Sequence, residues 1–340
     1  MRLQEGLGYK HLSAKEQKAY NLMLPAFSSM SGYIDFPGAV RDVDLMNIMH
    51  IALGDNPIIT YFDKTYVRFE EFVRGKRMIL TGVRPKFQAK KRDAVLNEIS
   101  GRIISSLRAK AGDEYSILIG LYEFIQKTVK YDDNQLNAIE RGRSISPDSH
   151  NAYGALVHNL AVCDGFSSAF SLLAKGLGFE SMLVSGNSAY RSASFVEHAW
   201  NIIKVQDRYY HLDVTWDTRD CKEFDGFSYT YFLLSDKEIK RDHVWDRKMA
   251  PACSCDNLSY YAKNGLLVNN AAELKGVFKT LNKNHNKVFK VKLSDRFILP
   301  ENPGDYLAQV LLKEIAATGK RVQISYTWDE NVRCFFAKVC

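Results

Sequence analysis

Three side chains that could form a nucleophilic catalytic site occur in one stretch of this sequence. Cys163 comes first, His198 follows after a serine-rich segment, and Asp213 comes next. A cysteine, a histidine and an acid can serve as nucleophile, as general base and acid, and as the group that orients the imidazole. The order and the residue types therefore predict a thiol nucleophile that attacks an acyl carbon.

The element expected to position Cys163 is an amphipathic helix. Apolar residues recur after it at three- and four-residue spacing, and Gly176 and Gly178 follow them as an end signal. Cys163 is thus expected at or just before the helix N-terminus, where unpaired amides and the helix dipole favour a thiolate. The same amides could bind an oxyanion. The carboxylate of Asp164 would oppose this effect by raising the thiol pKa.

His198 and Asp213 are expected on a β-hairpin, with strands over residues 198–205 and 209–215. If Gln206 and Asp207 form a two-residue turn, Val205 pairs with Arg208 and Asp213 shares the face of His198 as a diagonal neighbour. A three-residue turn would reverse that parity. The hairpin thus brings the acid to the histidine in the two-residue register.

Several motifs in the same order resemble the transglutaminase-like superfamily, and in particular its bacterial branch. The matching stretches are Ala152-Tyr-Gly-Ala-Leu-Val157, Ala161-Val-Cys-Asp-Gly-Phe166, His198-Ala-Trp-Asn201, His211-Leu-Asp-Val-Thr-Trp-Asp217, Tyr231-Phe-Leu-Leu-Ser235 and Asp242-His-Val-Trp-Asp246. The resemblance extends over residues 113–256. It implies a papain-like fold with Cys163 as nucleophile, His198 as base and Asp213 as third member of a catalytic triad. Asp164 and Phe166 depart from the pattern, because relatives often have a polar neutral residue and a tyrosine there.

Substrate contacts and a second oxyanion donor are expected near this triad. The candidates are Tyr153, His150, Trp200, Trp216 and Tyr190. His150 and Tyr153 are chosen because they precede the nucleophile and resemble family positions, while the aromatic residues fit either the core or the cleft wall. Asn201 is expected to satisfy backbone groups. Residues 134–150 and 187–197 are interpreted as loops over the cleft.

Composition narrows the class of protein. The chain has 340 residues, 46% hydrophobic and 25% charged, with a mean hydropathy of −0.25. These values are typical of a soluble globular protein. The formal charge of +7 is spread out, and the basic group at residues 86–92 is interpreted as the solvated start of a helix, so no nucleic-acid partner is expected. No apolar run reaches the roughly 18 residues of a membrane span, and the N-terminus has no signal peptide. A cytoplasmic protein and an exported mature form both remain open.

Neither a cofactor nor a metal ion is expected. Six cysteines do not suggest a disulfide scaffold. Cys253 and Cys255, with Cys221 and His243, could be imagined as a zinc site, but a Cys-x-Cys pair is too close for the usual spacing. A local disulfide or surface thiols fit these cysteines better.

The overall fold class expected is α+β, in three parts. Residues 1–88 are interpreted as an N-terminal α+β module, 89–260 as the papain-like catalytic domain, and 261–340 as a small C-terminal α/β module. The first helix starts at a capping box, Ser13 to Glu16, with Pro25 suggesting a kink or an early end. Long helices are expected over 89–111 and 114–130, and a strand over 227–234.

These observations predict cysteine-dependent acyl transfer on a protein or peptide substrate. Water as acceptor would make the protein a protease or amidase, and a lysine amine would make it a crosslinking transglutaminase. Hydrolysis is favoured, because no run of acidic residues suggests the calcium sites of animal transglutaminases. A catalytically silent scaffold that binds a protein partner is the alternative, since a fold does not fix a function. The oligomeric state is left open.

Overall fold

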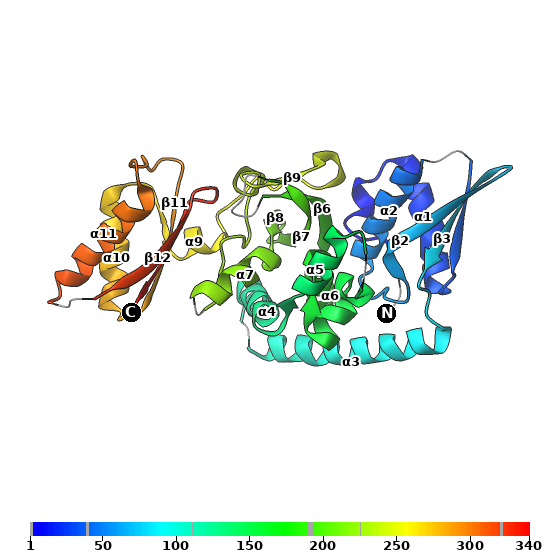
Figure 1. Ribbon diagram of the computed structural model, residues 1–340, viewed down its shortest axis with the longest axis horizontal. Coiled ribbons are helices and arrows are strands. Elements are labelled where there is room, and N and C mark those ends of the chain that lie inside the picture. Colours follow the sequence, from blue (N-terminus) through cyan, green and yellow to red (C-terminus); the bar gives the residue numbers. More distant parts are fainter. Residues whose placement is uncertain are drawn as a thin grey trace.

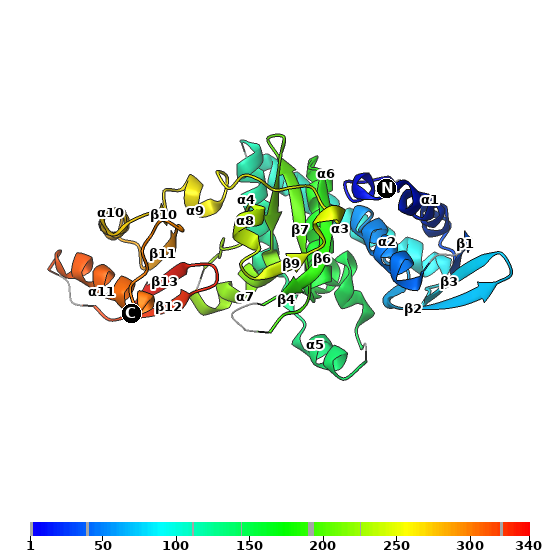
Figure 2. The same cartoon turned by 90° about the horizontal axis from the view of Figure 1, so that it is seen from above.

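The computed structural model describes residues 3–38, 41–110, 112–143, 145–189, 194–224, 226–319 and 322–340. Figure 1 shows an elongated molecule in which three modules follow one another in chain order. Figure 2, turned by 90°, shows the same succession. Three large clusters of buried apolar side chains accompany the modules, one centred on residues 12–89, one on residues 58–258 and one on residues 268–337. Fold class is α+β, as predicted.

The N-terminal module packs two helices on a small antiparallel sheet. Its elements are η1 (Tyr9–His11), α1 (Ala14–Ser28), β1 (Tyr33–Pro37), α2 (Asp42–Asp55), β2 (Asp63–Phe72) and β3 (Gly75–Thr81), and the strand order is β1-β3-β2. The predicted capping box is confirmed, because Ser13 accepts from the Glu16 amide and the Glu16 carboxylate accepts from the Ser13 amide. The helix continues through Pro25, so the expected early end is wrong.

The central module surrounds α6 with helices on one side and a sheet on the other. Its helices are α3 (Lys86–Lys110), α4 (Glu114–Thr128), α5 (Asp133–Glu140), α6 (Cys163–Leu177), α7 (Val214–Phe224) and α8 (Asp236–Ile239). Its four-stranded sheet has the order β8 (Arg208–Leu212), β7 (Val196–Val205), β6 (Ser181–Ser188) and β9 (His243–Trp245). Two short parallel strands, β4 (Lys130–Tyr131) and β5 (Leu160–Ala161), and the short helices η2 (Pro147–His150), η3 (Gly154–His158) and η4 (Arg247–Met249) complete it. Figure 1 shows α3 running along the lower side of the molecule from the N-terminal to the central module.

The apolar stripe predicted for α6 is the buried face of this helix. Phe166, Ala169, Phe170 and Leu173 are fully buried, and Gly178 ends the helix at a φ of 103°, which glycine adopts without steric cost. The hairpin has the expected two-residue turn, since Val205 pairs with Arg208. Both turn residues have positive φ, the backbone of a type I′ turn.

Three expected segments differ in the structure. The second hairpin strand ends at Leu212, and Val214 starts α7, because the Asp213 carboxylate accepts from the amides of Thr215 and Trp216 and so caps a helix. Residues 227–234 form turns with one bridge between Leu234 and His211, not a full strand. The segment 134–150, interpreted as a loop, contains α5 and η2.

The C-terminal module follows α9 (Tyr260–Lys263). It consists of β10 (Leu267–Val268), α10 (Ala271–Lys283), β11 (Val288–Leu293), α11 (Pro303–Ala316), β12 (Ile324–Asp329) and β13 (Cys334–Val339), in the sheet order β10-β11-β13-β12. Asn270 caps α10 by accepting from two backbone amides. Among the helices that the structure describes, none has the length and apolar character to cross a bilayer.

Candidate active site

The thiol at the start of α6 lies against strand β7. Cys163 is the first helical residue and is partly buried. The hydroxyl of Ser167, one turn further on, lies 2.9 Å from the Cys163 carbonyl oxygen and 3.0 Å from that of Ala199. Asn201 donates to the Ser167 carbonyl and to the Ser171 hydroxyl. These polar bonds fix the helix N-terminus beside the strand that carries His198.

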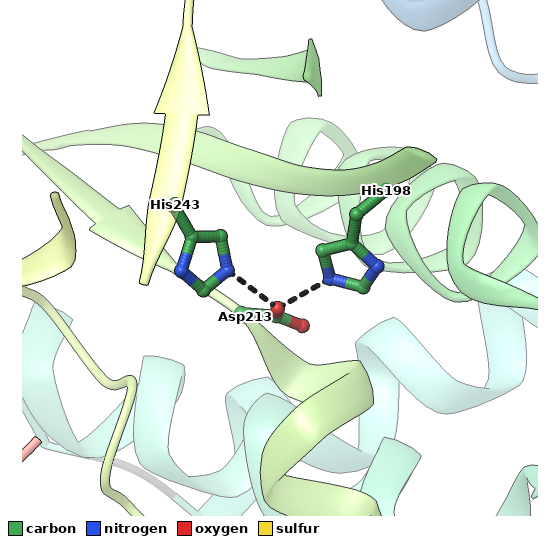
Figure 3. A group of neighbouring side chains, drawn as sticks. All are labelled: His198, Asp213 and His243. Carbon is green, nitrogen blue, oxygen red and sulfur yellow. Dashed lines mark hydrogen bonds and ion pairs between the residues drawn. The ribbon is translucent and has the colours of Figure 1, made fainter. Parts of the chain in front are cut away.

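His198 and Asp213 form a buried hydrogen-bonded pair (Figure 3). The distance from His198 Nε2 to Asp213 Oδ2 is 2.6 Å, and their side chains are 1% and 0% exposed. The other carboxylate oxygen accepts from the amides of Thr215 at 2.9 Å and Trp216 at 3.2 Å. Because Nε2 is bound to the acid, Nδ1 is the imidazole nitrogen that remains for a thiol.

Trp216 covers one face of the imidazole. Its ring lies 4.2 Å from that of His198, centroid to centroid, with an interplanar angle of 6°. The indole N–H donates to Ser188 Oγ at 2.8 Å, which fixes the indole in place. An aromatic face held this way excludes water and limits rotation of the histidine ring.

A second histidine, His243 on β9, shares the same acid and was not assigned a catalytic role in the sequence. Figure 3 shows both imidazoles pointing at Asp213, and His243 Nε2 lies 3.1 Å from Oδ2. The other nitrogen, Nδ1, lies 2.6 Å from Asp242 Oδ1, and Tyr231 donates to Oδ2 of Asp242. The signal for His243 was its place in one of the motifs that carry the family resemblance.

These contacts set the charges of the site. Burial opposes ionisation of Asp213, but the charges and hydrogen bonds of His198 and His243 outweigh it and lower its pKa. Burial also opposes protonation of His243, yet hydrogen bonds to Asp213 and Asp242 raise its pKa to about 9. The site therefore contains an ionised Asp213 held between two imidazoles, of which His243 is a cation at neutral pH.

The thiol itself is held in its neutral form. Burial raises the pKa of Cys163 to about 12, and the carboxylate of Asp164 adds to this effect. Hydrogen bonds from the backbone amides of Ala199 and Asp164 act in the opposite direction. Nucleophilic attack from this position requires a base that removes the thiol proton.

Two groups of described residues combine atom types that can bind metals. In the first, formed by His198, Asp213 and His243, nitrogen–oxygen distances of 2.6 and 3.1 Å are those of hydrogen bonds. Ligand atoms around a tetrahedral zinc ion lie roughly 3.3 Å apart, given bonds of about 2.0–2.2 Å. The geometry of this group is thus explained by hydrogen bonding.

The second group joins His211, Asp236 and Cys253. His211 Nδ1 accepts from the Trp200 indole at 3.0 Å, and Nε2 lies 2.9 Å from Asp236 Oδ1. Cys253 is buried rather than a surface thiol, and Cys255 Sγ lies 2.6 Å from an Arg208 nitrogen. Cys253 and Cys255 are both free, so neither forms the local disulfide that the sequence suggested, and His243 lies against Asp213.

The remaining sequence-based candidates lie in several places. His150 has both ring nitrogens engaged, with Asp164 and with Gln135, and Tyr153 stacks on the guanidinium of Arg92 at 3.6 Å. The ring nitrogens of His150 are thus bound to Asp164 and Gln135, and the ring face of Tyr153 is covered by Arg92. Trp200 is fully buried in the core. Tyr190 lies outside the described residues.

A pH-dependent stability is expected from His243. Its folded pKa of about 9 lies above the ordinary value of 6.5, so its contribution is fully present below about pH 6.5 and is lost as pH rises through 9. A shift of this size corresponds to roughly 3 kcal/mol. In urea unfolding, the stability difference between wild type and His243→Gln should shrink by that order between pH 6 and pH 9.5. A difference that stays constant with pH would contradict the charged state of His243.

Comparison with known proteins connects this geometry to a family. Residues 102–214 match the family model described as the transglutaminase-like superfamily. No curated protein matches the sequence. Among solved structures, a crystal structure of a TGase is 16% identical with a TM-score of 0.33, over 44% of this chain and 43% of that one. A proposed cysteine protease from Cytophaga hutchinsonii is 13% identical with a TM-score of 0.27, over 44% of this chain and 61% of that one. The match thus spans only about half the length of these two proteins.

Proposed function

Because residues 102–214 match the model of the transglutaminase-like superfamily, we propose that this chain is a cysteine-dependent acyl-transfer enzyme that hydrolyses amide bonds of protein or peptide substrates. The observation that carries the proposal is the buried 2.6 Å bond between His198 and Asp213. His198 lies on β7, the strand against which the Cys163 helix packs. That bond leaves His198 Nδ1 to serve the thiol.

The first half of the reaction forms a thioester. His198 Nδ1 takes the thiol proton while Cys163 sulfur bonds to the acyl carbon, and the carbonyl oxygen becomes an oxyanion. Amides at the start of α6 lack intrahelical acceptors and can stabilise that oxyanion. The C–N bond then breaks as the imidazolium returns its proton to the leaving nitrogen, and the acyl group stays on sulfur.

The second half releases the acyl group. His198 removes a proton from water, and the oxygen attacks the thioester. The C–S bond then breaks as the imidazolium returns the proton to sulfur, which gives a carboxylic acid and the free thiol. Asp213 holds the imidazole through Nε2 in both halves and stabilises its positive charge. An amine in place of water would give a crosslinked product by the same steps. We propose water as the acceptor, since the sequence has no acidic run of the calcium-dependent kind.

The acceptor can be measured directly. We would incubate the protein with casein whose lysines are dimethylated, in the presence of a biotinylated primary amine. Peptide cleavage and loss of side-chain amide report hydrolysis in mass spectra, and biotin incorporation reports amine transfer. We expect hydrolytic products in excess of biotinylated ones, and neither with Cys163→Ala. Predominant biotinylation would replace the hydrolase by a transferase, and no product above the Cys163→Ala background would contradict activity on this class of substrate.

A further inference from the structure

A lysine from the N-terminal module reaches the residue next to the nucleophile. Lys64 lies on β2, and its Nζ is 3.0 Å from Oδ2 of Asp164 in α6. The two side chains are only 15% and 23% exposed, so solvent screens the pair less than it would a surface ion pair. Two modules therefore meet at the start of the helix that carries Cys163.

The second partner of Asp164 is the imidazole of His150. Gln135 uses its carbonyl oxygen to accept from the amides of Ile145 and Ser146, so its NH₂ group faces Nε2 of His150 at 2.9 Å. Nδ1 of the same ring lies 3.0 Å from Asp164 Oδ2. Asp164 is thus held between the ammonium of Lys64 and this imidazole.

Other titratable groups surround the pair. His50 on α2 interacts with the charges of both Lys64 and Asp164. Burial, followed by the charge of Lys64, lowers the pKa of His50 to about 4, so His50 is neutral at pH 7. His50 also lines a cavity of about 410 Å³ between α2 and β6. Tyr131 on β4 is neutral too, because burial, followed by the interaction with Cys163, raises its pKa against the opposing charge of Arg219. Asp213 adds a more distant negative charge to the thiol.

The charge of Asp164 matters for the thiol. Burial opposes its ionisation, but Lys64 and His150 outweigh burial and lower its pKa, so the group is a carboxylate at neutral pH. A carboxylate one residue from Cys163 disfavours the thiolate, whereas a lysine bound to that carboxylate cancels much of its field. From the sequence alone, Asp164 was expected to disfavour the thiolate of Cys163. In the fold, Lys64 is bound to that carboxylate.

We propose that Lys64 is a positioning residue of the active site, supplied by the N-terminal module, which neutralises Asp164 so that Cys163 can lose its proton. This role rests on the proposed function of Cys163 as a nucleophile. It gives the N-terminal module a chemical part in the site, in addition to its packing against α6 and β6.

The test measures alkylation of Cys163 rather than turnover. Wild type, Lys64→Met, Lys64→Arg, Asp164→Asn and the double variant Lys64→Met/Asp164→Asn are treated with iodoacetamide between pH 6 and pH 9, and the rate at Cys163 is followed by peptide mass spectrometry. We expect Lys64→Met to slow alkylation at pH 7 by about tenfold, the effect of one pKa unit. Lys64→Arg should retain most of the wild-type rate of alkylation. The double variant should be alkylated at least as fast as wild type.

A matched control separates charge from docking. Lys175 also bridges α6 and the N-terminal module, with hydrogen bonds to the carbonyl oxygens of Gly54 and Asp55, but it sits in the last turn of α6, far from Cys163. Lys175→Met should leave the alkylation rate at Cys163 within twofold of wild type. If it slows the reaction as much as Lys64→Met does, docking of the module explains the effect and the proposal is overturned.

Asp164→Asn decides the sign of the effect. Asp164→Asn breaks the same ion pair as Lys64→Met, but it removes the negative charge instead of the positive one. The proposal therefore predicts that Cys163 is alkylated faster and with a lower pH midpoint. This prediction can be tested even if the Lys64→Met protein does not fold. Slower alkylation, or no rescue in the double variant, would overturn the proposal. His198→Ala in each background tests the proposed function separately. If His198→Ala does not change the alkylation rate while the Lys64 variants behave as expected, the proposed acyl-transfer function is contradicted. The effect of Lys64 on the Cys163 thiol is then still supported.

Discussion

Replacement of His198 by alanine should slow alkylation of Cys163 at pH 7 by about 10²- to 10³-fold, within the range that a general base contributes. The reason is the state of the thiol. Burial and Asp164 raise its pKa to about 12, so very little thiolate exists at neutral pH unless a base accepts the proton. His198 is the imidazole on the adjoining strand, and its tautomer is fixed by the 2.6 Å bond to Asp213. Iodoacetamide kinetics with mass-spectrometric mapping of the six cysteines measure this directly.

The matched control for that variant is His211→Ala. His211 is fully buried, binds an aspartate through Nε2 and lies on the neighbouring strand β8, as His198 lies on β7. Its loss should lower stability but leave alkylation of Cys163 within about twofold, because it contacts neither Asp213 nor the thiol in any described hydrogen bond. Equal slowing by both variants would show that the effect of His198 is a general loosening of the sheet rather than base catalysis.

The largest loss of stability is expected from Asp217→Ala. The buried carboxylate of Asp217 accepts four hydrogen bonds, from the hydroxyls of Tyr122 and Ser228 at 2.6 Å each, and from the amides of Thr230 and Tyr231 at 2.9 and 3.0 Å. Alanine would remove the acceptor of the Thr230 and Tyr231 amides, whereas the Tyr122 hydroxyl also lies 2.8 Å from the Asp213 carbonyl oxygen and the Ser228 hydroxyl 3.4 Å from Asp220. Since each unsatisfied buried group costs about 1–3 kcal/mol, the free energy of unfolding should fall by roughly 3–5 kcal/mol.

Urea unfolding followed by tryptophan fluorescence measures this change, because three of the four tryptophans lie in the central module. Glu98→Ala is the control. Glu98 is 69% exposed on α3 and forms only a 3.7 Å pair with Arg102, so its loss should change the stability by less than about 0.5 kcal/mol. A loss below about 1 kcal/mol for Asp217→Ala would mean that the segment 228–231 is held by packing rather than by this carboxylate.

Local patterns sufficed for the elements that carry Cys163 and His198. The apolar stripe and Gly178 fixed the extent of α6, and the short turn at Gln206 and Asp207 fixed the hairpin register. Each of these signals acts within one element or between adjacent strands, where spacing along the chain determines which side chains meet.

The strand expected through Thr215 was wrong for a tertiary reason. Val214 and Thr215 are β-branched and favour a strand, but the carboxylate of Asp213 caps a helix there. The amide of Asp213 also donates to the Tyr231 carbonyl at 3.0 Å, a contact between segments distant in the sequence. Propensity could not reveal the segment that pairs with this residue.

Lys64 and His243 could not be assigned from sequence spacing. Lys64 meets Asp164 across a difference of 100 positions, and His243 meets Asp213 across 30. Neither residue belongs to a periodic pattern that points to its partner, and both contacts depend on how β2 and β9 pack. The charges around the nucleophile therefore emerge only with the tertiary structure, whereas the predicted triad required only the order of three residues.

The central proposal is that Cys163 accepts an acyl group with the help of His198. The most direct measurement is the mass of the protein after brief reaction with p-nitrophenyl acetate near pH 7, followed by peptide mapping and treatment with hydroxylamine, which cleaves thioesters but not amides. The proposal predicts one acetyl group on Cys163, removed by hydroxylamine, absent from Cys163→Ala and formed far more slowly by His198→Ala. Acetylation confined to lysines, or a rate at Cys163 that does not depend on His198, would contradict it.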